Sequence, residues 1–455
     1  MHQNATVELE DYLIEDKDAG QYKIHRSMFT DPALFELELK HIWEKVWVYI
    51  GHESQIAKKK DFITGYIGRQ PIILNRDKSD NINVFLNACR HRGAKLCKLK
   101  KGNQGLFACP FHGWTYGANG ELKAVTDQNK GGYPEQFDKD DYPLERVPSV
   151  ENYRGFIFAS LDADAPPLQE WLGDTTRIID MMVNQSPKGL EVLKGSSSYT
   201  YNGNWKLQAE NGVDGYHVGT VHWNYVATMK NRAKINLAGT KTKTMDVNGL
   251  SDNAGGYFDF GNGHTLLWGD WPNPQDRPIY GHKEEFAEKH GEAEANWMVG
   301  RLRNQLIFPN VFLMDQMSSQ IRMFRPIAVD KTEVTIFVLA PVGEAPDLRR
   351  NRLRQYEDFF NASGMATADD LSEFESCQEG SLASASPWSD ISRGAIQQVD
   401  GGNQYAEEIG LKPHSSGAAL EDEGIFIAQH RNWLKLMTQG IANDAKNSNT
   451  SKGQS

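Results

Sequence analysis

Two short pairs of cysteine and histidine lie in the first quarter of the chain. Cys89 and His91 form a C-x-H pair, and Cys109 and His112 form a C-x-x-H pair seventeen residues further on. Structural zinc sites usually take cysteines from one turn and histidines from another, whereas one of each per loop suits a [2Fe-2S] cluster with two histidines on one iron. The pattern favours a Rieske-type cluster held by these four residues, ahead of a zinc site or two ordinary loops.

A second group of residues suited to iron lies further along the chain. His217 and His222 are five positions apart. Two imidazoles and one carboxylate on one face of a non-haem Fe(II) ion leave coordination positions open for O2 and substrate. Five residues advance an ideal helix by about 500°, leaving the two side chains about 140° apart. Convergence on a metal would need a π-bulge or a loosened helix end near Gly219. The alternative is an amphipathic helix that contains a glycine and binds no metal, but the upstream cluster motif favours the metal site.

The cysteine and histidine pairs lie in a region of short β-rich runs. These runs are separated by glycine, asparagine and aspartate, which predicts an all-β unit over residues 51–162 with the pairs at hairpin tips. Cys97, between the pairs, is predicted to be a small core residue. The predicted strands cover residues 62–66, 71–74, 83–87 and 155–160.

The histidine pair lies in a second region, residues 163–440, where helical and strand patterns alternate. Predicted helices cover 168–185, 205–225, 348–362 and 422–439, and predicted strands cover 197–201, 320–324 and 333–340. This mixture indicates an α+β fold. Residues 1–50 are predicted to be a helical segment, with a helix over 31–49, that packs on this region, and the polar tail 441–455 is predicted to be disordered.

Composition limits the classes of partner and the compartment. The 455 residues include 49 Lys and Arg against 60 Asp and Glu, a net charge of -11, which argues against nucleic acid or an anionic membrane as a partner. The longest apolar stretch, Val334 to Val342, is too short to cross a bilayer. Acidic residues near Met1 occupy the positions where an export signal carries basic ones. A cytoplasmic protein whose four cysteines are thiols or metal ligands is expected.

The segments C-R-H-R-G and C-P-F-H-G-W-x-Y are similar to the Rieske domains of bacterial aromatic-ring-hydroxylating dioxygenases. In respiratory Rieske proteins two further cysteines brace the loops, and Ala94 and Phe111 stand at those positions here. The resemblance therefore implies the ferredoxin-like, low-potential type of cluster.

The segment from Asn204 to His222 resembles the catalytic helix of the same family. The resemblance implies that His217 and His222 are iron ligands, and that Asp214 bridges toward the cluster of a neighbouring subunit. The family's third ligand comes from an acidic pair after a long helix, here Asp369 and Asp370. Asp370 is the preferred candidate and Asp369 the second choice, and a helix N-cap would also account for the pair.

The resemblance extends from Phe29 to about Leu436 and is closest to the large (alpha) subunits of benzoate, toluate, 2-halobenzoate and anthranilate 1,2-dioxygenases. It implies a Rieske domain joined to a helix-grip catalytic domain with an antiparallel sheet. It also implies cis-dihydroxylation of an aromatic carboxylate at the 1,2 positions with O2. A preference for anthranilate or another substituted benzoate, such as a halobenzoate, is kept open by Gln208, Val213, Val226 and the stretch 248–257. A Rieske monooxygenase would share both metal sites, and a plain electron-transfer protein would use only the cluster.

The chain lacks a G-x-G-x-x-G nucleotide-binding motif, so electrons must come from a separate reductase. The resemblance implies a flavin and iron-sulfur reductase that uses NADH, a small beta subunit and an α3β3 assembly. A benzoate carboxylate in an apolar pocket would need a cationic partner, and a guanidinium fits best. The sequence does not select one of the four candidates in this half, which are Arg301, Arg303, Arg322 and Arg325.

Overall fold

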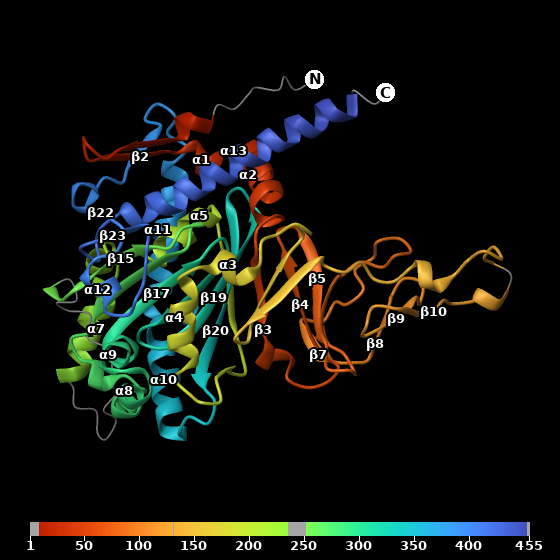
Figure 1. The fold of residues 1–455 in the computed structure, drawn as a ribbon, viewed down its shortest axis with the longest axis horizontal. Coiled ribbons are helices and arrows are strands. Elements are labelled where there is room, and N and C mark those ends of the chain that lie inside the picture. The colour runs from red at the N-terminus through yellow and green to blue at the C-terminus, as the bar shows by residue number, and fades with distance from the viewer. Residues whose placement is uncertain (1–8, 131, 235–251, 453–455) are drawn as a thin grey trace. The chain divides into compact units, whose positions relative to one another are not determined.

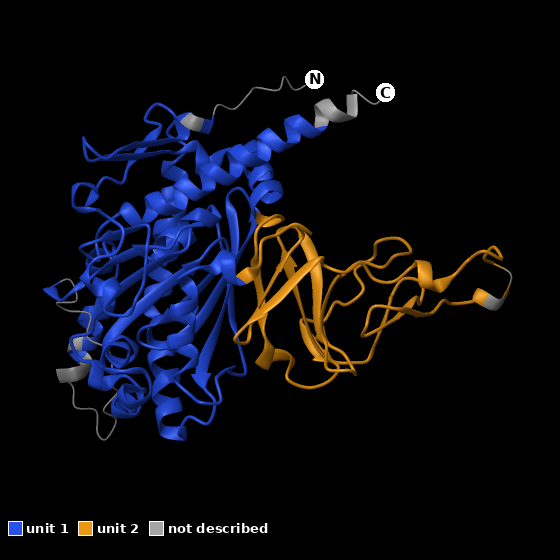
Figure 2. Ribbon diagram, in the orientation of Figure 1, with its two compact units in different colours: residues 1–42, 169–455 blue, residues 43–168 orange. Residues whose placement is uncertain are grey.

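The computed structural model describes residues 9–130, 132–234 and 252–452. The chain divides into two compact units, one of residues 43–168 and one of residues 1–42 with 169–455 (Figure 2). Residues 1–8 of the predicted N-terminal segment, 453–455 of the predicted tail and 248–251 of the stretch 248–257 lie outside the described ranges. Within those ranges, none of the helices combines the length and the apolar character that a bilayer crossing requires.

The smaller unit consists of antiparallel strands in three sheets, ordered β6-β5-β4-β7, β11-β12-β3 and β10-β9-β8 (Figure 1). Successive side chains of a strand point to opposite faces, so β5 places Ile72 and Leu74 in one apolar core and Ile73 in another. The second core also contains Cys89 and Cys109. The strands are β3 (Val48–His52), β4 (Asp61–Ile67), β5 (Gln70–Arg76), β6 (Ile82–Leu86), β7 (Lys101–Asn103), β8 (Leu106–Ala108), β9 (Thr115–Gly117), β10 (Leu122–Ala124), β11 (Ser149–Tyr153) and β12 (Phe156–Ser160).

The larger unit is built on a ten-stranded antiparallel sheet with the order β13-β20-β19-β18-β17-β16-β15-β23-β22, in which β14 also pairs with β20 (Figure 1). Every residue of β17 and β18 is buried, because both faces of the central sheet are covered. The strands are β13 (Leu190–Val192), β14 (Ser197–Tyr201), β15 (Gly255–Asp259), β16 (Thr265–Asp270), β17 (Arg301–Ile307), β18 (Val311–Asp315), β19 (Ser319–Ala328), β20 (Lys331–Pro341), β22 (Val399–Asp400) and β23 (Ser415–Gly417).

Helices cover this sheet: α4 and α9 pack on β17, α5 on β19, and α13 on β15 and β16. A second, small sheet joins β1 (Leu13–Asp16), β2 (Gln21–His25) and β21 (Trp388–Asp390). The helices are α1 (Ser27–Thr30), α2 (Pro32–Glu38), α3 (Leu168–Leu172), α4 (Thr175–Val183), α5 (Trp205–Asn211), α6 (Val218–Val221), α7 (Trp223–Lys234), α8 (Lys283–His290), α9 (Glu292–Gly300), α10 (Pro346–Phe359), α11 (Met365–Gly380), α12 (Gln404–Glu407) and α13 (Gly424–Lys452).

The N-terminal segment differs from the predicted helix over residues 31–49. Helix α2 ends at Glu38, a π-helical turn covers Leu39–Trp43, and residues from Val48 onward form β3. Pairing of β3 with β12 takes these residues into the all-β unit, so tertiary pairing overrides the helical spacing. The segment also contains the β1-β2 hairpin, so it is not purely helical.

Glu38 ties the N-terminal segment to the rest of the larger unit. Its side chain is fully buried and accepts hydrogen bonds from Trp205 Nε1 at 2.8 Å, Lys206 Nζ at 2.5 Å and Trp433 Nε1 at 2.7 Å. These bonds connect α2 with α5 and α13. Burying one carboxylate and one ammonium together is tolerated because each satisfies the other.

The prediction of a disordered tail from residue 441 is wrong for the described residues, because α13 continues to Lys452. Two contacts hold this part of the helix: Lys40 donates to Asp444 at 2.5 Å, and His41 Nε2 lies 3.2 Å from the same carboxylate. Polar composition indicated disorder, but α13 is already nucleated upstream, and extending an existing helix is far easier than starting one.

Candidate functional site

The segment that carries the two histidines is not one continuous helix. Helix α5 ends at Asn211, α6 covers only Val218–Val221, and α7 begins at Trp223. His217 therefore precedes α6 and His222 follows it. The backbone angles of His222 (φ -96°, ψ 19°) are not helical. The predicted single helix over 205–225 is wrong, and the break allows the two imidazoles to converge without a π-bulge.

Two glycines set the path of the chain through this break. A Cβ atom on Gly212 would lie 2.3 Å from the ring of Phe312, and one on Gly215 would lie 2.3 Å from the backbone carbonyl oxygen of Leu420. A Cβ atom at either position would force its neighbours to shift, which glycine avoids. After the turn, Asp214 Oδ1 accepts from the backbone N–H of Tyr216 at 2.7 Å and of His217 at 3.3 Å, and so holds the loop that enters α6.

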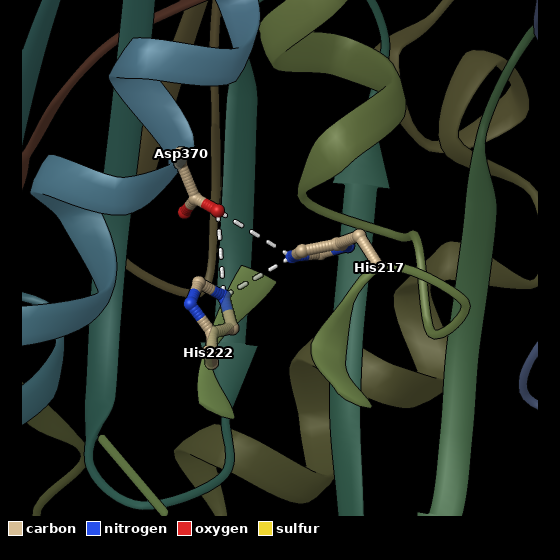
Figure 3. Close-up of side chains that lie close together, drawn as sticks. All are labelled: His217, His222 and Asp370. Atoms are coloured by element: carbon tan, nitrogen blue, oxygen red, sulfur yellow. Dashed lines mark hydrogen bonds and ion pairs between the residues drawn. The ribbon is translucent and has the colours of Figure 1, made fainter. Parts of the chain in front are cut away.

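Asp370 reaches the two histidines from α11, in the second turn of that helix. Helix α11 is capped by Gly364 and not by either aspartate, so the N-cap interpretation of the acidic pair is wrong. Figure 3 shows the three side chains converging from separate elements. Asp370 Oδ1 lies 3.5 Å from His217 Nε2 and 3.3 Å from His222 Nε2, and the two Nε2 atoms are 3.1 Å apart.

These distances suit a metal ion placed between the three atoms. Ligand atoms about 2.1 Å from a transition metal ion, at angles of roughly 90 to 110°, are about 3.0 to 3.4 Å from each other. Among the described residues, this trio is the one group of three or more potential ligands found close enough to share an ion. Two imidazoles and a carboxylate form the donor set of non-haem Fe(II) sites. The residues present therefore fit a mononuclear iron.

Burial and neighbouring charges shift the pKa values of all three side chains. Burial lowers the pKa of His217, but the carboxylates of Asp214 and Asp370 outweigh it and raise the pKa to about 10. Burial lowers the pKa of His222, and the positive charge of His217 adds to this effect. Burial raises the pKa of Asp370, but His217, His222 and Arg322 together bring it below its ordinary value. Metal binding replaces the proton shared by such a site.

The outer nitrogens of the two imidazoles face carboxylates. Asp214 Oδ2 lies 3.1 Å from His217 Nδ1, and Asp369 Oδ2 lies 3.9 Å from His222 Nδ1. At 3.1 Å, the Asp214 carboxylate holds the ring orientation of His217 and keeps its proton on Nδ1, which leaves Nε2 as a ligand, whereas 3.9 Å is too long for Asp369 to do the same for His222. Asn211 adds a hydrogen bond from Nδ2 to Asp370 Oδ1 at 3.3 Å. Because Asp369 faces Nδ1 of His222, it lies on the side of that ring away from the Nε2 atoms and Asp370 Oδ1.

The cysteine and histidine pairs occupy two loops of the smaller unit with the same backbone geometry. In the first, Gly93 N–H donates to Cys89 O at 2.8 Å, and in the second, Gly113 N–H donates to Cys109 O at 3.0 Å. Both glycines have left-handed φ angles, 71° and 73°, which the turns require. The sequence predicted hairpin-like loops here, and the two loops follow β6 and β8.

The loops separate the thiols from the imidazoles. Cys89 and Cys109 are buried, whereas His91 and His112 are exposed, with their ring centroids 4.6 Å apart. Burial raises the pKa of the Cys89 thiol, and the neighbouring Cys109 thiol adds to this effect. Two inner thiols and two outer imidazoles are the donor arrangement that a [2Fe-2S] cluster with cysteines on one iron and histidines on the other requires.

Two aromatic residues, to which the residue pattern alone gave no role, support the loops. Trp114 stacks on His91 with centroids 5.2 Å apart and an interplanar angle of 11°. The hydroxyl of Tyr116 lies 3.4 Å from Cys89 Sγ and accepts from the backbone N–H of Arg90 at 3.1 Å. Hydrogen bonds to the sulfurs tune cluster potentials. The W-x-Y spacing directly after the second pair was the signal that could have found them.

A cavity of about 730 Å³ opens beside the histidine pair in the larger unit. Its apolar walls include Trp271, Met317, Phe359 and Phe360, and its polar lining includes Asn304, Gln316 and Arg322 together with His217, His222 and Asp370. A volume of this size holds a small aromatic molecule. The metal ligand atoms and an apolar chamber therefore belong to one site.

Comparison with known proteins agrees with this combination of two sites. Residues 46–151 match the family model of the Rieske [2Fe-2S] domain, and residues 191–423 match that of the ring hydroxylating alpha subunit (catalytic domain). The solved structure of naphthalene 1,2-dioxygenase from Rhodococcus sp. bound to indole superposes with a TM-score of 0.79 at 25% identity, covering 91% of this chain and 94% of that one.

Three curated relatives cover nearly the whole chain. Toluate 1,2-dioxygenase subunit alpha of Pseudomonas putida is 49% identical over 94% of this chain and 93% of its own. The 2-halobenzoate 1,2-dioxygenase large subunit of Burkholderia cepacia is 49% identical, covering 95% and 92%. The anthranilate 1,2-dioxygenase large subunit of Acinetobacter baylyi is 47% identical, covering 93% and 91%. The chain belongs to the family of aromatic-ring-hydroxylating dioxygenase alpha subunits, and the resemblance seen in the sequence is confirmed.

Family membership also confirms the expected α+β architecture and the cofactors. The protein has an all-β Rieske domain and a catalytic domain with an antiparallel sheet and helices. Its cofactors are a Rieske [2Fe-2S] cluster and a mononuclear iron. The relatives named above are called a subunit alpha in one case and a large subunit in the other two.

Proposed function

We propose that this chain is the terminal oxygenase large subunit that cis-dihydroxylates an aromatic carboxylate, benzoate or a substituted benzoate, at its 1,2 positions. The observation that carries the proposal is one cavity that holds the convergent His217, His222 and Asp370 between apolar walls. Relatives named for toluate, 2-halobenzoate and anthranilate support a ring that bears a carboxylate. The reaction consumes one O2 and one NADH with a proton, and gives a cis-diol and NAD+.

His217, His222 and Asp370 are proposed as the ligands of the mononuclear iron. When bound, this iron supplies the site at which O2 is activated with electrons from the cluster. The chain's own residues hold the ligand set: Asp214 keeps the proton of His217 on Nδ1, and Asn211 fixes the ligating oxygen of Asp370. The apolar walls exclude water from the reacting ring.

Cys89, His91, Cys109 and His112 are proposed as the ligands of the Rieske cluster. Their support is the paired loop geometry, with thiols inside and imidazoles at the surface. Exposed imidazoles are suited to receive electrons from a partner, because electron transfer slows steeply with distance through protein. Asp214 is proposed as the residue that couples the mononuclear site to the cluster of a neighbouring subunit.

The partners are proposed to be a small beta subunit in an α3β3 assembly and a flavin and iron-sulfur reductase that oxidises NADH. Support comes from the names of the relatives, which are large or alpha subunits. Dependence on NADH favours a cytoplasmic location.

The test is an oxygen-uptake screen with purified large and small subunits, an NADH-dependent reductase, and benzoate, anthranilate, toluates and 2-halobenzoates as substrates. We expect oxygen uptake coupled to cis-diol formation with at least one of these acids, and none with benzene. Asp370→Ala should abolish the uptake and serves as the control for reductase leakage. Uptake with hydrocarbons alone, or uptake that yields only hydrogen peroxide, would contradict the proposal.

A further inference from the structure

The four arginines that the sequence could not rank differ sharply in their partners. Arg303 pairs with Asp315, and Arg301 donates to Asp270 at 2.8 Å and Glu408 at 2.7 Å. Arg325 donates to Glu333 through Nε at 3.0 Å and Nη2 at 2.8 Å. Arg322 has no ion pair among the described residues. It is only 3% exposed, and its Nε and Nη2 atoms have no hydrogen-bond partner within the described part of the chain.

The register of the sheet explains this difference. Asn304 of β17 lies opposite Met314 of β18, which lies opposite Gln320 of β19, so these side chains share one face. Arg322 follows Gln320 by two residues and projects from that same face. Asn304, Met314 and Arg322 all line the cavity.

The other three candidates project from the opposite face. Arg303 pairs with Asp315, the residue next to Met314 in β18. Adjacent residues of a strand point to opposite faces, so Arg303 projects away from the face that carries Met314. Arg301 is two residues from Arg303, and Arg325 is three from Arg322, so alternation turns both away from the cavity face. None of these three lines the cavity.

Within the cavity, Arg322 faces an aromatic side chain of the lining. Its guanidinium carbon is 5.3 Å from the centroid of the Phe360 ring, and its positive charge helps to lower the pKa of Asp370. A contact with an aromatic face satisfies no N–H donor, so Nε and Nη2 still lack a partner among the described residues. A carboxylate bound to the guanidinium would leave the attached ring in the apolar chamber with His217 and His222.

A buried guanidinium without an anion is costly, and this cost indicates a negatively charged ligand. Arg393, the other arginine in the described lining, is exposed, and its guanidinium lies over Tyr216 at 4.2 Å, so water can solvate it. Two neutral amides of the lining bond to each other, since Gln316 Nε2 donates to Asn304 Oδ1 at 2.8 Å. Arg322 is therefore the buried cation of the lining that lacks a partner among the described residues.

We propose that Arg322 binds the carboxylate of the substrate through a bidentate pair, and that this contact orients the ring toward the metal site. The inference rests on the proposed function, because it requires an aromatic carboxylate as substrate. Arg322 then determines specificity: it selects acids over neutral aromatics of the same shape, since a neutral ligand leaves the buried charge unpaired.

The experiment measures binding to the iron-loaded, reduced oxygenase by anaerobic calorimetric titration. The probes are benzoate and benzamide, which have nearly the same shape and differ in charge. Arg322→Met removes the charge and keeps an unbranched side chain in place of the aliphatic stem of arginine. Arg325→Met is the matched control, because it removes a charge from the same strand but from the opposite face. Iron content is measured for every variant.

Arg322→Met should weaken benzoate binding by at least about 100-fold, the range for loss of one partner from a buried charge pair. Benzamide binding should change by less than about threefold, iron content should stay at the wild-type level, and Arg325→Met should bind both probes as the wild type does. Arg322→Lys keeps a charge without the planar fork, so it should weaken benzoate binding by about tenfold. If Arg322→Met does not fold, the benzoate affinity of Arg322→Lys tests the carboxylate contact.

Three outcomes would overturn the inference. Benzoate affinity unchanged in a folded Arg322 variant would exclude the carboxylate contact. Equal weakening of benzoate and benzamide, together with loss of iron, would assign Arg322 a structural role beside Asp370. Loss of benzoate binding in Arg393→Met alone would move the anchor to that residue. In each case wild-type binding of benzoate leaves the proposed function standing, whereas failure of the wild type to bind any aromatic carboxylate would contradict that function itself.

Discussion

At the scale of single residues, the type and spacing of the potential ligands could be predicted, but their final geometry could not. The sequence singled out His217 and His222 and left a choice between Asp369 and Asp370. In the structure, Asp370 Oδ1 lies within 3.5 Å of both Nε2 atoms, whereas Asp369 lies beside the outer nitrogen of His222. Arg322 was one of four equal candidates, because strand register is needed to distinguish the cavity face from the other.

The ligand assignment predicts the effect of single alanine substitutions. His217→Ala, His222→Ala and Asp370→Ala should each lose nearly all mononuclear iron and activity, because two remaining ligands bind Fe(II) weakly. Asp369→Ala should lose less, since its carboxylate is 3.9 Å from the outer nitrogen of His222. The measurement is iron content together with the visible spectrum of the Rieske cluster, which should be unchanged.

His282→Ala is the matched control, because its side chain is half exposed and lies just before α8, away from the cavity lining. It should keep full iron. If Asp369→Ala loses iron and Asp370→Ala keeps it, the choice between the two aspartates is wrong.

Asp214 is predicted to act on electron transfer and not on metal retention. Asp214→Asn keeps an oxygen for the backbone N–H groups of Tyr216 and His217 but removes the charge facing His217 Nδ1. Both metals should remain bound, and the cluster should still be reduced. Reoxidation of the reduced cluster by O2 with benzoate should slow by at least about 100-fold, measured by rapid-mixing absorbance. Reoxidation at the wild-type rate would show that the charge of Asp214 plays no part in coupling.

At the scale of elements, strands were predicted more accurately than the helices of the site. The predicted strand 197–201 coincides with β14, and 333–340 lies within β20. The predicted helix over 205–225 is instead broken between α5 and α6. This break depends on Gly212 meeting Phe312 and Gly215 meeting Leu420, contacts with elements distant in the chain that no local spacing reveals.

The break predicts opposite effects for two glycine substitutions in the same segment. Gly215→Ala should displace the loop before His217, because its Cβ would lie 2.3 Å from the carbonyl oxygen of Leu420. We expect a loss of about 1 to 3 kcal/mol in the free energy of unfolding and reduced iron content. Thermal unfolding and iron analysis of the purified variant test this.

Gly219→Ala is the control within α6. A Cβ at Gly219 meets nothing within 4 Å, and alanine favours a helix by about 1 kcal/mol over glycine. This variant should keep its iron and unfold at or slightly above the wild-type temperature. Equal behaviour of the two variants would show that the close approach at Gly215 does not position His217.

At the scale of the whole molecule, the order of the regions and their fold class followed from the sequence. The all-β pattern of the first region and the mixed pattern of the second reflect different periodicities, 2 and 3.6 residues, that local sequence encodes. The N-terminal residues up to Ile42 return to the larger unit, and β1 and β2 pair with β21. Such pairing over long sequence separations has no local signature. The polar composition of residues 441–452 likewise gave no indication that α13 continues through them.

The placement of the two metal sites in separate compact units predicts independent loss of their metals. The intact protein should contain about three iron atoms per chain, two in the cluster and one mononuclear. A mild Fe(II) chelator should remove about one iron and all oxygenase activity, while the visible absorbance of the cluster persists. Added Fe(II) should restore activity. Simultaneous loss of absorbance and iron would indicate that the two sites do not behave independently.

The most direct test of the central claim is the source of the oxygen atoms in the product. A single turnover of the pre-reduced oxygenase with benzoate under 18O2, followed by mass spectrometry, reports how many atoms of one O2 molecule enter the ring. A dioxygenase should give a cis-diol in which both new hydroxyl oxygens carry the label. A product with one labelled oxygen would identify a monooxygenase, and unchanged benzoate would contradict the assignment of an aromatic carboxylate as substrate.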